Sequence, residues 1–218
     1  MDDAYWDRVI DDVSEALTLL RPTFDPSAGG DGFVSIEVAP DLARDTVGTI
    51  TAARDLHARV DQPNLFVKIP ATAEGLLAIQ AMTAEGRSVN ITLIFSLSRY
   101  RQVIEAYRSG LEKFTGTGGD VSAVNSGASF FVSRVDSEVD RRLESIGTPE
   151  AFVLRGRAGV AQAKLVYQLF SDQSPTIGGS NSQNTVHACN GCDGLRPRQR
   201  TRRSPTRCTS ITSSAPTR

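Results

Sequence analysis

Lysine is rare in this chain of 218 residues, and Lys68 lies within the apolar run Leu-Phe-Val-Lys-Ile at residues 65–69. Such a run predicts a buried strand, so the side chain either points into a barrel interior or snorkels out at the strand end. A lysine in an apolar environment loses its proton more readily, and the neutral amine attacks a carbonyl to form a Schiff base. Lys68 is therefore a candidate nucleophile, with a snorkelling lysine as the alternative.

Two other apolar segments carry polar side chains. Glu37 lies in Ser-Ile-Glu-Val at residues 35–38, where a carboxylate is costly unless it has a partner. Beside a Schiff-base lysine it can act as general acid and base, and the alternative is a structural ion pair. Asn90 and Thr92 flank Ile91 and so share one face of a strand. Their amide and hydroxyl suit substrate hydroxyls or a bound water, unless the strand simply has one polar face.

A fourth segment, Ser-Phe-Phe-Val-Ser-Arg at residues 129–134, contains Ser129 and Arg134. We expect Arg134 at the carboxyl end of a strand, where parallel α/β sheets bind ligands. Its guanidinium matches phosphate geometry, whereas a surface ion pair is the alternative. Because polar positions recur in four consecutive units, they support one another.

The elements that would position these residues alternate along the chain. We expect strands at 33–38, 65–69, 88–95 and 126–133, and helices at 5–21, 41–60, 72–85, 98–109, 136–146 and 158–170. Pro22 is expected to close the first helix, and Gly110 to break the one before it. The strand spacing is that of βα units with strands covered on both faces, which indicates a parallel α/β fold.

Composition changes sharply near Phe170. Residues 1–170 carry 17 basic and 23 acidic side chains, whereas residues 171–218 carry 7 basic and 2 acidic ones and all three cysteines. No stretch approaches the length of a membrane span, and the acidic start does not resemble a secretory signal. We therefore expect a cytoplasmic protein without nucleic-acid or membrane partners.

Residues 171–218 lack the apolar periodicity that a folded segment needs, so we expect this tail to be disordered. A shifted reading frame in a GC-rich gene would produce its composition, and a natural disordered tail is the alternative. A binding module is a further possibility, since His187, Cys189, Cys192 and Cys208 include a Cys-x-x-Cys pair that could bind zinc. The arginine cluster at 196–207 could contact phosphate groups.

Four motifs in this order, S-I-E-V, L-F-V-K-I-P-A-T-x-E-G, V-N-I-T-L-I-F-S and S-x-F-V-S-R-V-D, resemble transaldolase. That family comprises Schiff-base (β/α)8 TIM barrels of the pentose phosphate pathway. The resemblance covers about Tyr5 to Phe170 and is most similar to the long actinobacterial type. It implies an α/β fold that forms part of such a barrel.

By this resemblance, Lys68 forms the imine, and Glu37 is the acid–base residue, acting through a water that Thr92 also holds. Asn90 and Ser129 would bind the substrate's hydroxyls and ketose portion, and Arg134 its phosphate. The implied reaction converts sedoheptulose 7-phosphate and glyceraldehyde 3-phosphate into erythrose 4-phosphate and fructose 6-phosphate. It needs no metal and no organic cofactor.

The sequence also departs from the family pattern. The family's opening strand with a catalytic aspartate, and the T-T-N-P-type motif after it, have no counterpart, because Asp2 and Asp3 precede a helix. The tail shows no pattern for the last two strands or for a second phosphate-binding arginine. We therefore expect residues 1–170 to hold about four βα units, the third to the sixth. The alternative to an enzyme is a catalytically inactive α/β fragment.

Overall fold

Strands and helices alternate along the chain, as the sequence predicts. The computed structural model describes residues 3–27, 30–173, 184–189 and 209–212, the last two ranges as backbone only. The helices are α1 (Asp3–Phe24), α2 (Thr46–Val60), α3 (Ala73–Ala84), α4 (Leu97–Gly116), α5 (Val132–Ile146), α6 (Pro149–Val153) and α7 (Ala158–Gln173), with 3-10 turns η1 (Asp25–Ser27), η2 (Pro40–Arg44) and η3 (Val121–Ala123). The strands are β1 (Val34–Glu37), β2 (Leu65–Pro70), β3 (Val89–Ile94), β4 (Ser126–Phe131), β5 (Asn184–Cys189) and β6 (Thr209–Thr212).

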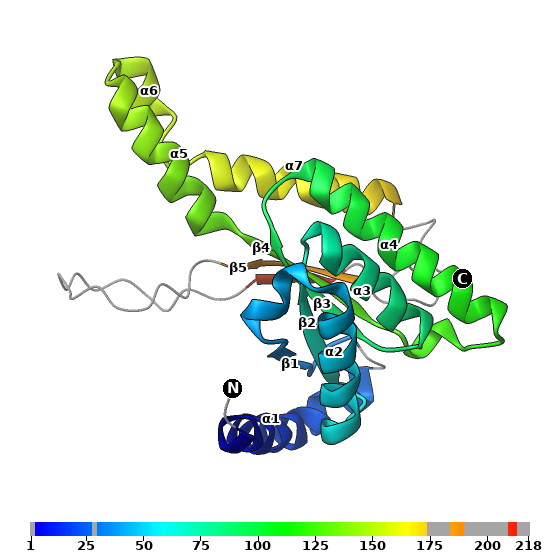
Figure 1. Ribbon diagram of the computed structural model, residues 1–218. Helices are drawn as coiled ribbons and strands as arrows, with labels where there is room; N and C mark the ends of the chain where they lie inside the picture. The colour runs from blue at the N-terminus through cyan, green and yellow to red at the C-terminus, as the bar shows by residue number, and fades with distance from the viewer. Residues whose placement is uncertain (1–2, 28–29, 174–183, 190–208, 213–218) are drawn as a thin grey trace.

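One sheet contains all of these strands in the order β1-β2-β3-β4-β5-β6. The first five strands pair in parallel, and β6 pairs with β5 in the antiparallel sense. Each of β1 to β4 is followed by a helix (Figure 1). This repeat confirms the predicted parallel α/β fold with about four βα units, which is consistent with part of a (β/α)8 barrel.

The two faces of the sheet differ in chemistry. Val67, Ile69, Val89 and Ile91 are completely buried and form the core with residues of the surrounding helices, including α2, α3 and α4. The residues that alternate with them, among them Lys68 and Asn90, lie on the other face. We call these the helix face and the inner face of the sheet. Polar side chains therefore gather on the face that a closed barrel would enclose.

The prediction that Pro22 closes the first helix is wrong, because α1 continues through Pro22 to Phe24. A proline in the last turn costs only one backbone hydrogen bond. The extra turn brings the Phe24 ring into edge-to-face contact with Phe33, with ring centroids 5.1 Å apart. Packing of the Phe24 ring thus accompanies the extension of α1 beyond Pro22, which the helix propensity of proline disfavours.

Other element boundaries also differ from the expectation. The helix predicted at 41–60 is divided at Asp45, whose side chain caps α2 by accepting a hydrogen bond of 2.9 Å from the Gly48 N–H. Helix α5 begins directly after β4, so its first turn includes Arg134. The additional short helix α6 follows the turn at Gly147.

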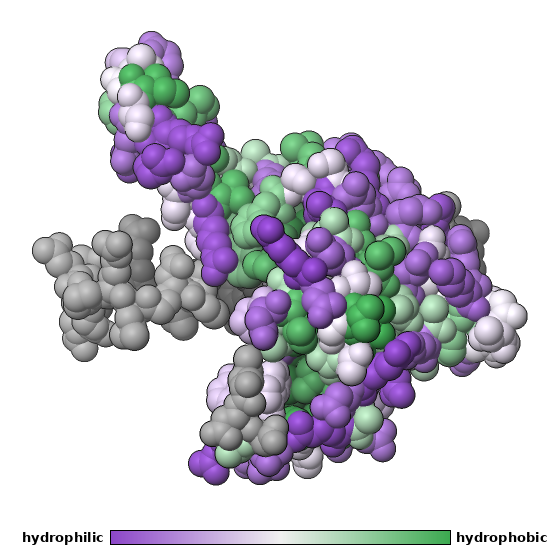
Figure 2. All heavy atoms as spheres, in the orientation of Figure 1, coloured by the Kyte–Doolittle hydropathy of each residue, from purple (hydrophilic) through white to green (hydrophobic). Residues whose placement is uncertain are grey.

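Helices α5 and α6 project away from the sheet (Figure 1), and their far end exposes apolar surface (Figure 2). Ile146, Phe152 and Val153 are exposed there. Along α5, Glu138 accepts hydrogen bonds from Arg141 and Arg142, which lower the pKa of Glu138 to about 2. No helix in the described ranges has the length and apolar content that crossing a bilayer requires.

The tail contains two strands that the sequence does not predict, β5 and β6. Strand β5 pairs with β4 over six residues, from Ser126 opposite Asn184 to Phe131 opposite Cys189. Neither segment contains an apolar run that would predict a strand. A segment without such a run can still pair through its backbone with the edge strand of a sheet. Residues 171–173 of the predicted tail belong to helix α7, which therefore ends later than predicted. The rest of the predicted disorder falls on residues that the structure does not describe, and the out-of-frame origin of the tail stays a prediction.

The prediction that Gly110 breaks its helix is also wrong, because α4 runs from Leu97 to Gly116 with Gly110 buried inside it. Here α4 crosses α3 so closely that a Cβ atom at Gly110 would lie 2.6 Å from Cβ of Thr83 and 2.8 Å from the Gln80 carbonyl oxygen. The glycine is needed for this approach of two helices and not for a turn.

We predict that Gly110→Ala lowers the free energy of unfolding by about 1–3 kcal/mol, because overpacking outweighs the better helix propensity of alanine. Gly116→Ala, in the same helix, is the matched control, since nothing lies within 4 Å of a Cβ there. Urea unfolding measures both. If Gly110→Ala were as stable as Gly116→Ala, the close approach of α3 and α4 would be incorrect.

We also predict acid sensitivity from His57, which is 6% exposed in the last turn of α2. Burial, together with the guanidinium of Arg87, lowers the pKa of His57 to about 4, although a hydrogen bond with the Ser88 backbone and the Glu85 carboxylate act in the opposite direction. The unfolded chain binds this proton near pH 6.5, so stability is lost as the pH falls from about 6.5 towards 4. The loss at the lower limit is roughly 3 kcal/mol.

The measurement is the urea midpoint between pH 7.5 and 5, roughly the range above most carboxylate titration. His57→Gln is the comparison, because glutamine keeps polarity without titrating. The midpoint of the unsubstituted chain should fall more steeply than that of His57→Gln. Parallel curves would show that His57 is not the group responsible.

Candidate active site

Lys68 and Glu37 meet on the inner face of the sheet. The two residues are register partners on the adjacent parallel strands β2 and β1, so their side chains lie on the same face. Lys68 Nζ donates a hydrogen bond of 3.0 Å to Glu37 Oε2. The side chains are 26% and 47% exposed, so the pair is open to solvent. The sequence left open a desolvated lysine or one that snorkels out of the strand. The Lys68 side chain is partly exposed and paired with Glu37, because its apolar neighbours Val67 and Ile69 lie on the helix face.

Asn90 and Ser129 are also brought together on this face. Asn90, on β3, is the register partner of Lys68, and its Oδ1 accepts a hydrogen bond of 2.9 Å from Ser129 Oγ on β4. Asn90 Nδ2 donates to Ser35 Oγ on β1 across 3.1 Å. A polar network thus links three strands around the lysine, and both predicted residues, Asn90 and Ser129, belong to it.

Thr92 lies two residues beyond Asn90 on β3 and is 1% exposed. Its carbonyl oxygen accepts a hydrogen bond of 2.8 Å from the Ala71 N–H. Directly after it, Leu93 has a left-handed φ of 58°, and the register between β3 and β4 shifts between Ile91 and Ile94. This bulge interrupts the alternation that the sequence predicts through residue 95. Bulges and left-handed non-glycine residues of this kind are enriched beside active sites.

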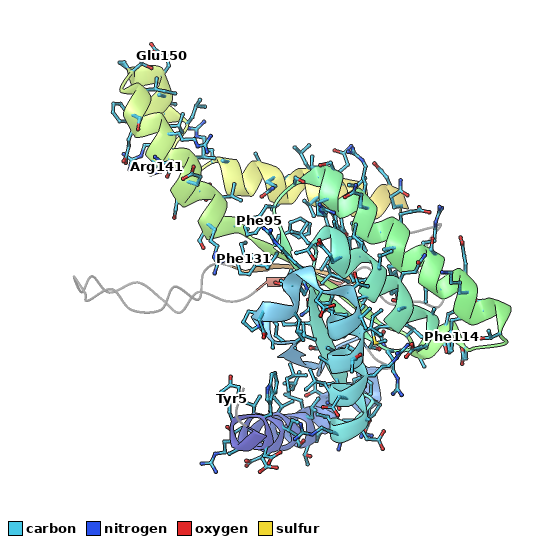
Figure 3. All side chains as sticks on the ribbon, in the orientation of Figure 1. Tyr5, Phe95, Phe114, Phe131, Arg141 and Glu150 are labelled. Carbon is cyan, nitrogen blue, oxygen red and sulfur yellow. The ribbon has the colours of Figure 1, made fainter. Side chains whose placement is uncertain are left out.

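Arg134 lies in the first turn of α5, just past the end of β4 where the sequence places it. The guanidinium carbon is 4.5 Å from the centroid of the Phe131 ring. Phe131 in turn stacks on Phe95, with centroids 5.8 Å apart (Figure 3). Among the described residues, Arg134 makes no ion pair with a carboxylate and no hydrogen bond with Lys68 or Glu37. An aromatic surface, and not a counter-charge, supports this guanidinium.

Aromatic rings lie at the amino end of the inner face. Phe33 and Phe66 stack with ring centroids 4.1 Å apart. Ser35, the residue two positions after Phe33, is the register partner of Phe66. Glu37, Lys68 and Ser129 lie past the middle of their strands, towards the carboxyl ends at which (β/α)8 barrels bind ligands. Ser35 and Asn90 lie nearer the amino ends of β1 and β3.

Sequence reasoning missed Ser35 and Phe131 as members of this site. The signal for Ser35 was present, because Ser35 and Glu37 are two residues apart in one strand and so share a face. The same period of two separates Phe131 from Phe130, because Phe131 is two residues after Ser129 in β4. Phe130 points the other way and contacts Tyr100 of α4.

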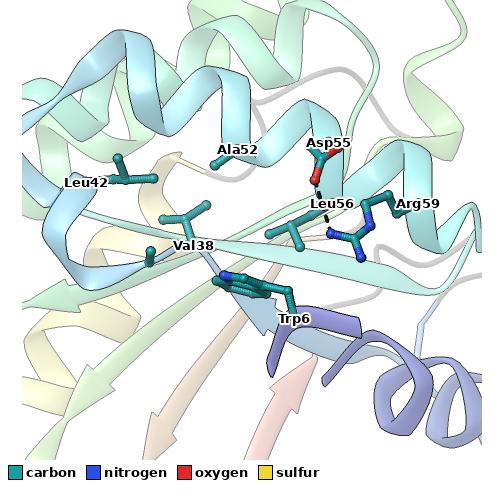
Figure 4. A pocket seen from close by; sticks show the side chains of 8 residues that line it. Trp6, Val38, Leu42, Ala52, Asp55, Leu56 and Arg59 are labelled. Atoms are coloured by element: carbon teal, nitrogen blue, oxygen red, sulfur yellow. Dashed lines mark ion pairs between the residues drawn. The ribbon is translucent and has the colours of Figure 1, made fainter. Parts of the chain in front are cut away.

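A separate pocket of about 240 Å³ lies between α1 and α2 (Figure 4). Its lining residues are Trp6, Val38, Ala39, Leu42, Ala52, Asp55, Leu56 and Arg59. Arg59 is paired with Asp7 at 2.6 Å and with Asp55 at 3.6 Å, so its charge is already compensated. This pocket contains none of the predicted site residues.

The possible zinc ligands of the tail are only partly covered by the structure. His187 and Cys189 belong to β5, of which the backbone alone is described, and Cys192 and Cys208 lie outside the described residues. The arginine cluster at 196–207 also lies outside them. Within the described ranges, no three His, Cys, Asp or Glu side chains are grouped in a way that could hold a metal ion.

The chain is similar in sequence to proteins of one known family. Residues 1–194 match the model of the family described as Transaldolase/Fructose-6-phosphate aldolase, so the match includes β5. The chain is 56% identical over 161 residues to a transaldolase of Arthrobacter sp. (strain FB24), a match that covers 74% of this chain and 43% of the relative.

Other curated relatives agree. A transaldolase of Mycolicibacterium smegmatis is 56% identical over 162 residues, covering 74% of this chain and 44% of the relative. A transaldolase of Mycobacterium bovis is 50% identical over 189 residues, covering 83% of this chain and 51% of the relative. The chain thus spans about half or less of the length of these relatives. By sequence, and by the βα repeat that presents Lys68 on its inner face, the chain belongs to the transaldolase/fructose-6-phosphate aldolase family.

Proposed function

We propose that this chain carries out transaldolase chemistry through a Schiff base. In this reaction Lys68 takes up a dihydroxyacetone unit from a ketose phosphate and passes it to an aldehyde. The observation that carries the proposal is the contact of 3.0 Å between Lys68 Nζ and Glu37 Oε2 on an open, polar face of the sheet. A nucleophile with an acid–base group within hydrogen-bond reach is the arrangement that amine catalysis requires.

The first step follows from this contact. Glu37 accepts a proton from the Lys68 ammonium, and the neutral amine attacks the ketone carbon of the donor to give a carbinolamine. Glu37 then returns the proton to the departing hydroxyl, which leaves as water, and the C=N bond forms. Thr92 is proposed to help hold the water through which Glu37 exchanges protons, since it follows on the same strand as Asn90.

The iminium then draws electrons from the neighbouring carbon–carbon bond. Loss of a proton from the hydroxyl beyond that bond releases an aldehyde and leaves an enamine on Lys68. The enamine adds to the acceptor aldehyde, and water hydrolyses the new imine. Because the lysine accepts the electrons, the proposed steps need no metal and no organic cofactor.

Substrate binding is assigned to the residues around the pair. Asn90 and Ser129 are proposed to hydrogen-bond the hydroxyls of the ketose, and Arg134 to bind its phosphate through the guanidinium. The proposed donor and acceptor are sedoheptulose 7-phosphate and glyceraldehyde 3-phosphate, and the proposed products are erythrose 4-phosphate and fructose 6-phosphate, in the pentose phosphate pathway of the cytoplasm. The relatives' name, transaldolase, supports this choice.

The test is trapping of the imine. The intact chain is incubated with fructose 6-phosphate, reduced with borohydride, digested and analysed by mass spectrometry. We expect a three-carbon adduct on Lys68, because cleavage of the bound ketose leaves dihydroxyacetone on the lysine. Lys113 and Lys164 serve as internal controls, since both are exposed and lie outside the inner face.

An adduct spread over all three lysines would indicate non-specific reaction. If Lys68 carried no adduct under conditions that trap a full-length relative, the chain would be a catalytically inactive α/β fragment. A six-carbon adduct would show imine formation without cleavage and so would limit the proposal to its first step.

We further predict that Glu37→Gln slows trapping by about 10²- to 10⁴-fold, because glutamine cannot exchange the proton. The ion pair is partly exposed, so its loss should cost no more than about 1 kcal/mol of stability. Asp41→Asn is the matched control, since Asp41 is an exposed carboxylate of η2 and not of strand β1. Equal trapping rates for Glu37→Gln and Asp41→Asn would remove Glu37 from the mechanism.

A further inference from the structure

Asn90 is held from both sides by serine hydroxyls. Its Oδ1 accepts a hydrogen bond of 2.9 Å from Ser129 Oγ on β4, and its Nδ2 donates one of 3.1 Å to Ser35 Oγ on β1. The first serine comes from the neighbouring strand, whereas the second lies across β2, the strand that carries Lys68. The amide therefore spans the sheet beside the lysine.

Burial makes these two hydrogen bonds matter. Asn90 is 8% exposed and Ser129 is 7% exposed, whereas Ser35 is half-buried. Water therefore does not readily replace Ser129, and it reaches the Ser35 partner more easily. A side-chain amide can rotate about its last bond and exchange its oxygen and nitrogen, and its hydrogen-bond partners decide which way it stands. In this structure, Ser129 holds the oxygen and Ser35 holds the nitrogen.

One N–H donor of the Asn90 amide has no partner among the described residues. An asparagine amide has two N–H donors, and Ser35 accepts only one of them. Among the described residues, Nδ2 makes no second hydrogen bond. Asn90 and Lys68 are register partners on the same face, which brings their Cβ atoms to roughly 5 Å apart. The Asn90 amide, with one N–H not used by Ser35, thus belongs to the residue next to Lys68 on the inner face.

We propose that Ser35 is a positioning residue, which fixes the Asn90 amide so that its second N–H serves an oxygen of the carbon chain attached to Lys68. The inference rests on the proposed function, since it assigns Asn90 a substrate contact. Ser35 itself touches no substrate and acts only through Asn90. Without Ser35, the amide keeps only its Ser129 partner and loses a defined orientation.

The first experiment observes the amide directly. In the intact chain labelled with ¹⁵N, the side-chain amide signals of Asn90, assigned by their loss in Asn90→Ala, are compared with those of Ser35→Ala. We expect a changed shift and faster hydrogen exchange in Ser35→Ala. Ser126→Ala is the matched control, because Ser126 is a buried serine at the start of β4, one residue out of phase with Ser129. An Asn90 amide signal unaffected by Ser35→Ala would overturn the proposed hydrogen bond.

The second experiment is a double-mutant cycle on imine trapping with dihydroxyacetone, which carries no phosphate. Ser35→Ala should slow trapping about three- to tenfold, the value of one hydrogen bond. In the Asn90→Ala background, the same change should have no further effect, because Ser35 acts only through Asn90. A merely structural role would lower trapping by the same factor in both backgrounds, and that result would overturn the inference. Ser35→Thr, which keeps the hydroxyl, should restore most of the rate.

The outcomes of the two proposals are separable. If the unsubstituted chain is not trapped at all, the proposed function fails, while the amide measurement still decides whether Ser35 holds Asn90. If the chain is trapped on Lys68 and the cycle is additive, the proposed function stands and the role of Ser35 is rejected. Urea midpoints of all variants show whether a slow variant is simply unfolded.

Discussion

The parallel register of β1, β2 and β3 is the constraint on which the site depends. It sets Glu37 opposite Lys68 and Lys68 opposite Asn90, and the two-residue period of a strand then sends all three side chains to one face. A shift of β2 by one residue relative to its neighbours would move Lys68 to the helix face. There it would lie among completely buried apolar residues and away from Glu37. The ion pair at 3.0 Å is thus a consequence of strand pairing.

The helix face makes that register robust. Val67, Ile69, Val89 and Ile91 are fully buried in the core that the sheet shares with its helices, so a shifted strand would expose apolar side chains and bury charged ones. The close crossing of α3 and α4 at Gly110 belongs to the same layer. Stability therefore comes mainly from one side of the sheet. The other side is free to carry polar groups, which are costly in a core unless they are hydrogen-bonded to one another.

Polar groups on the inner face satisfy one another in two ways. Lys68 and Glu37 neutralise each other, and Asn90 links Ser35 with Ser129. Arg134 has a third kind of partner, the Phe131 ring, which supports the guanidinium without occupying its N–H groups. An amine, a carboxylate, an amide and a guanidinium are thus gathered in one part of the molecule, and these are the groups on which the proposed chemistry depends.

The amino-acid sequence alone predicted strands β1 to β4 and the helices α1 to α5 and α7, because hydrophobic periodicity is a local property. It also named Lys68, Glu37, Asn90, Thr92, Ser129 and Arg134 as candidate site residues from residue type and position. The continuation of α1 past Pro22 and of α4 past Gly110 accompanies tertiary contacts, namely those of the Phe24 ring and of the neighbouring helix α3. The strands β5 and β6 depend on pairing between distant segments, which no local pattern encodes. Only the folded sheet decided which side chains touch. The contact between Lys68 and Glu37 joins residues 31 positions apart, and the hydrogen bonds of Asn90 with Ser129 and Ser35 join residues 39 and 55 positions apart. Distance along a chain does not predict distance in space.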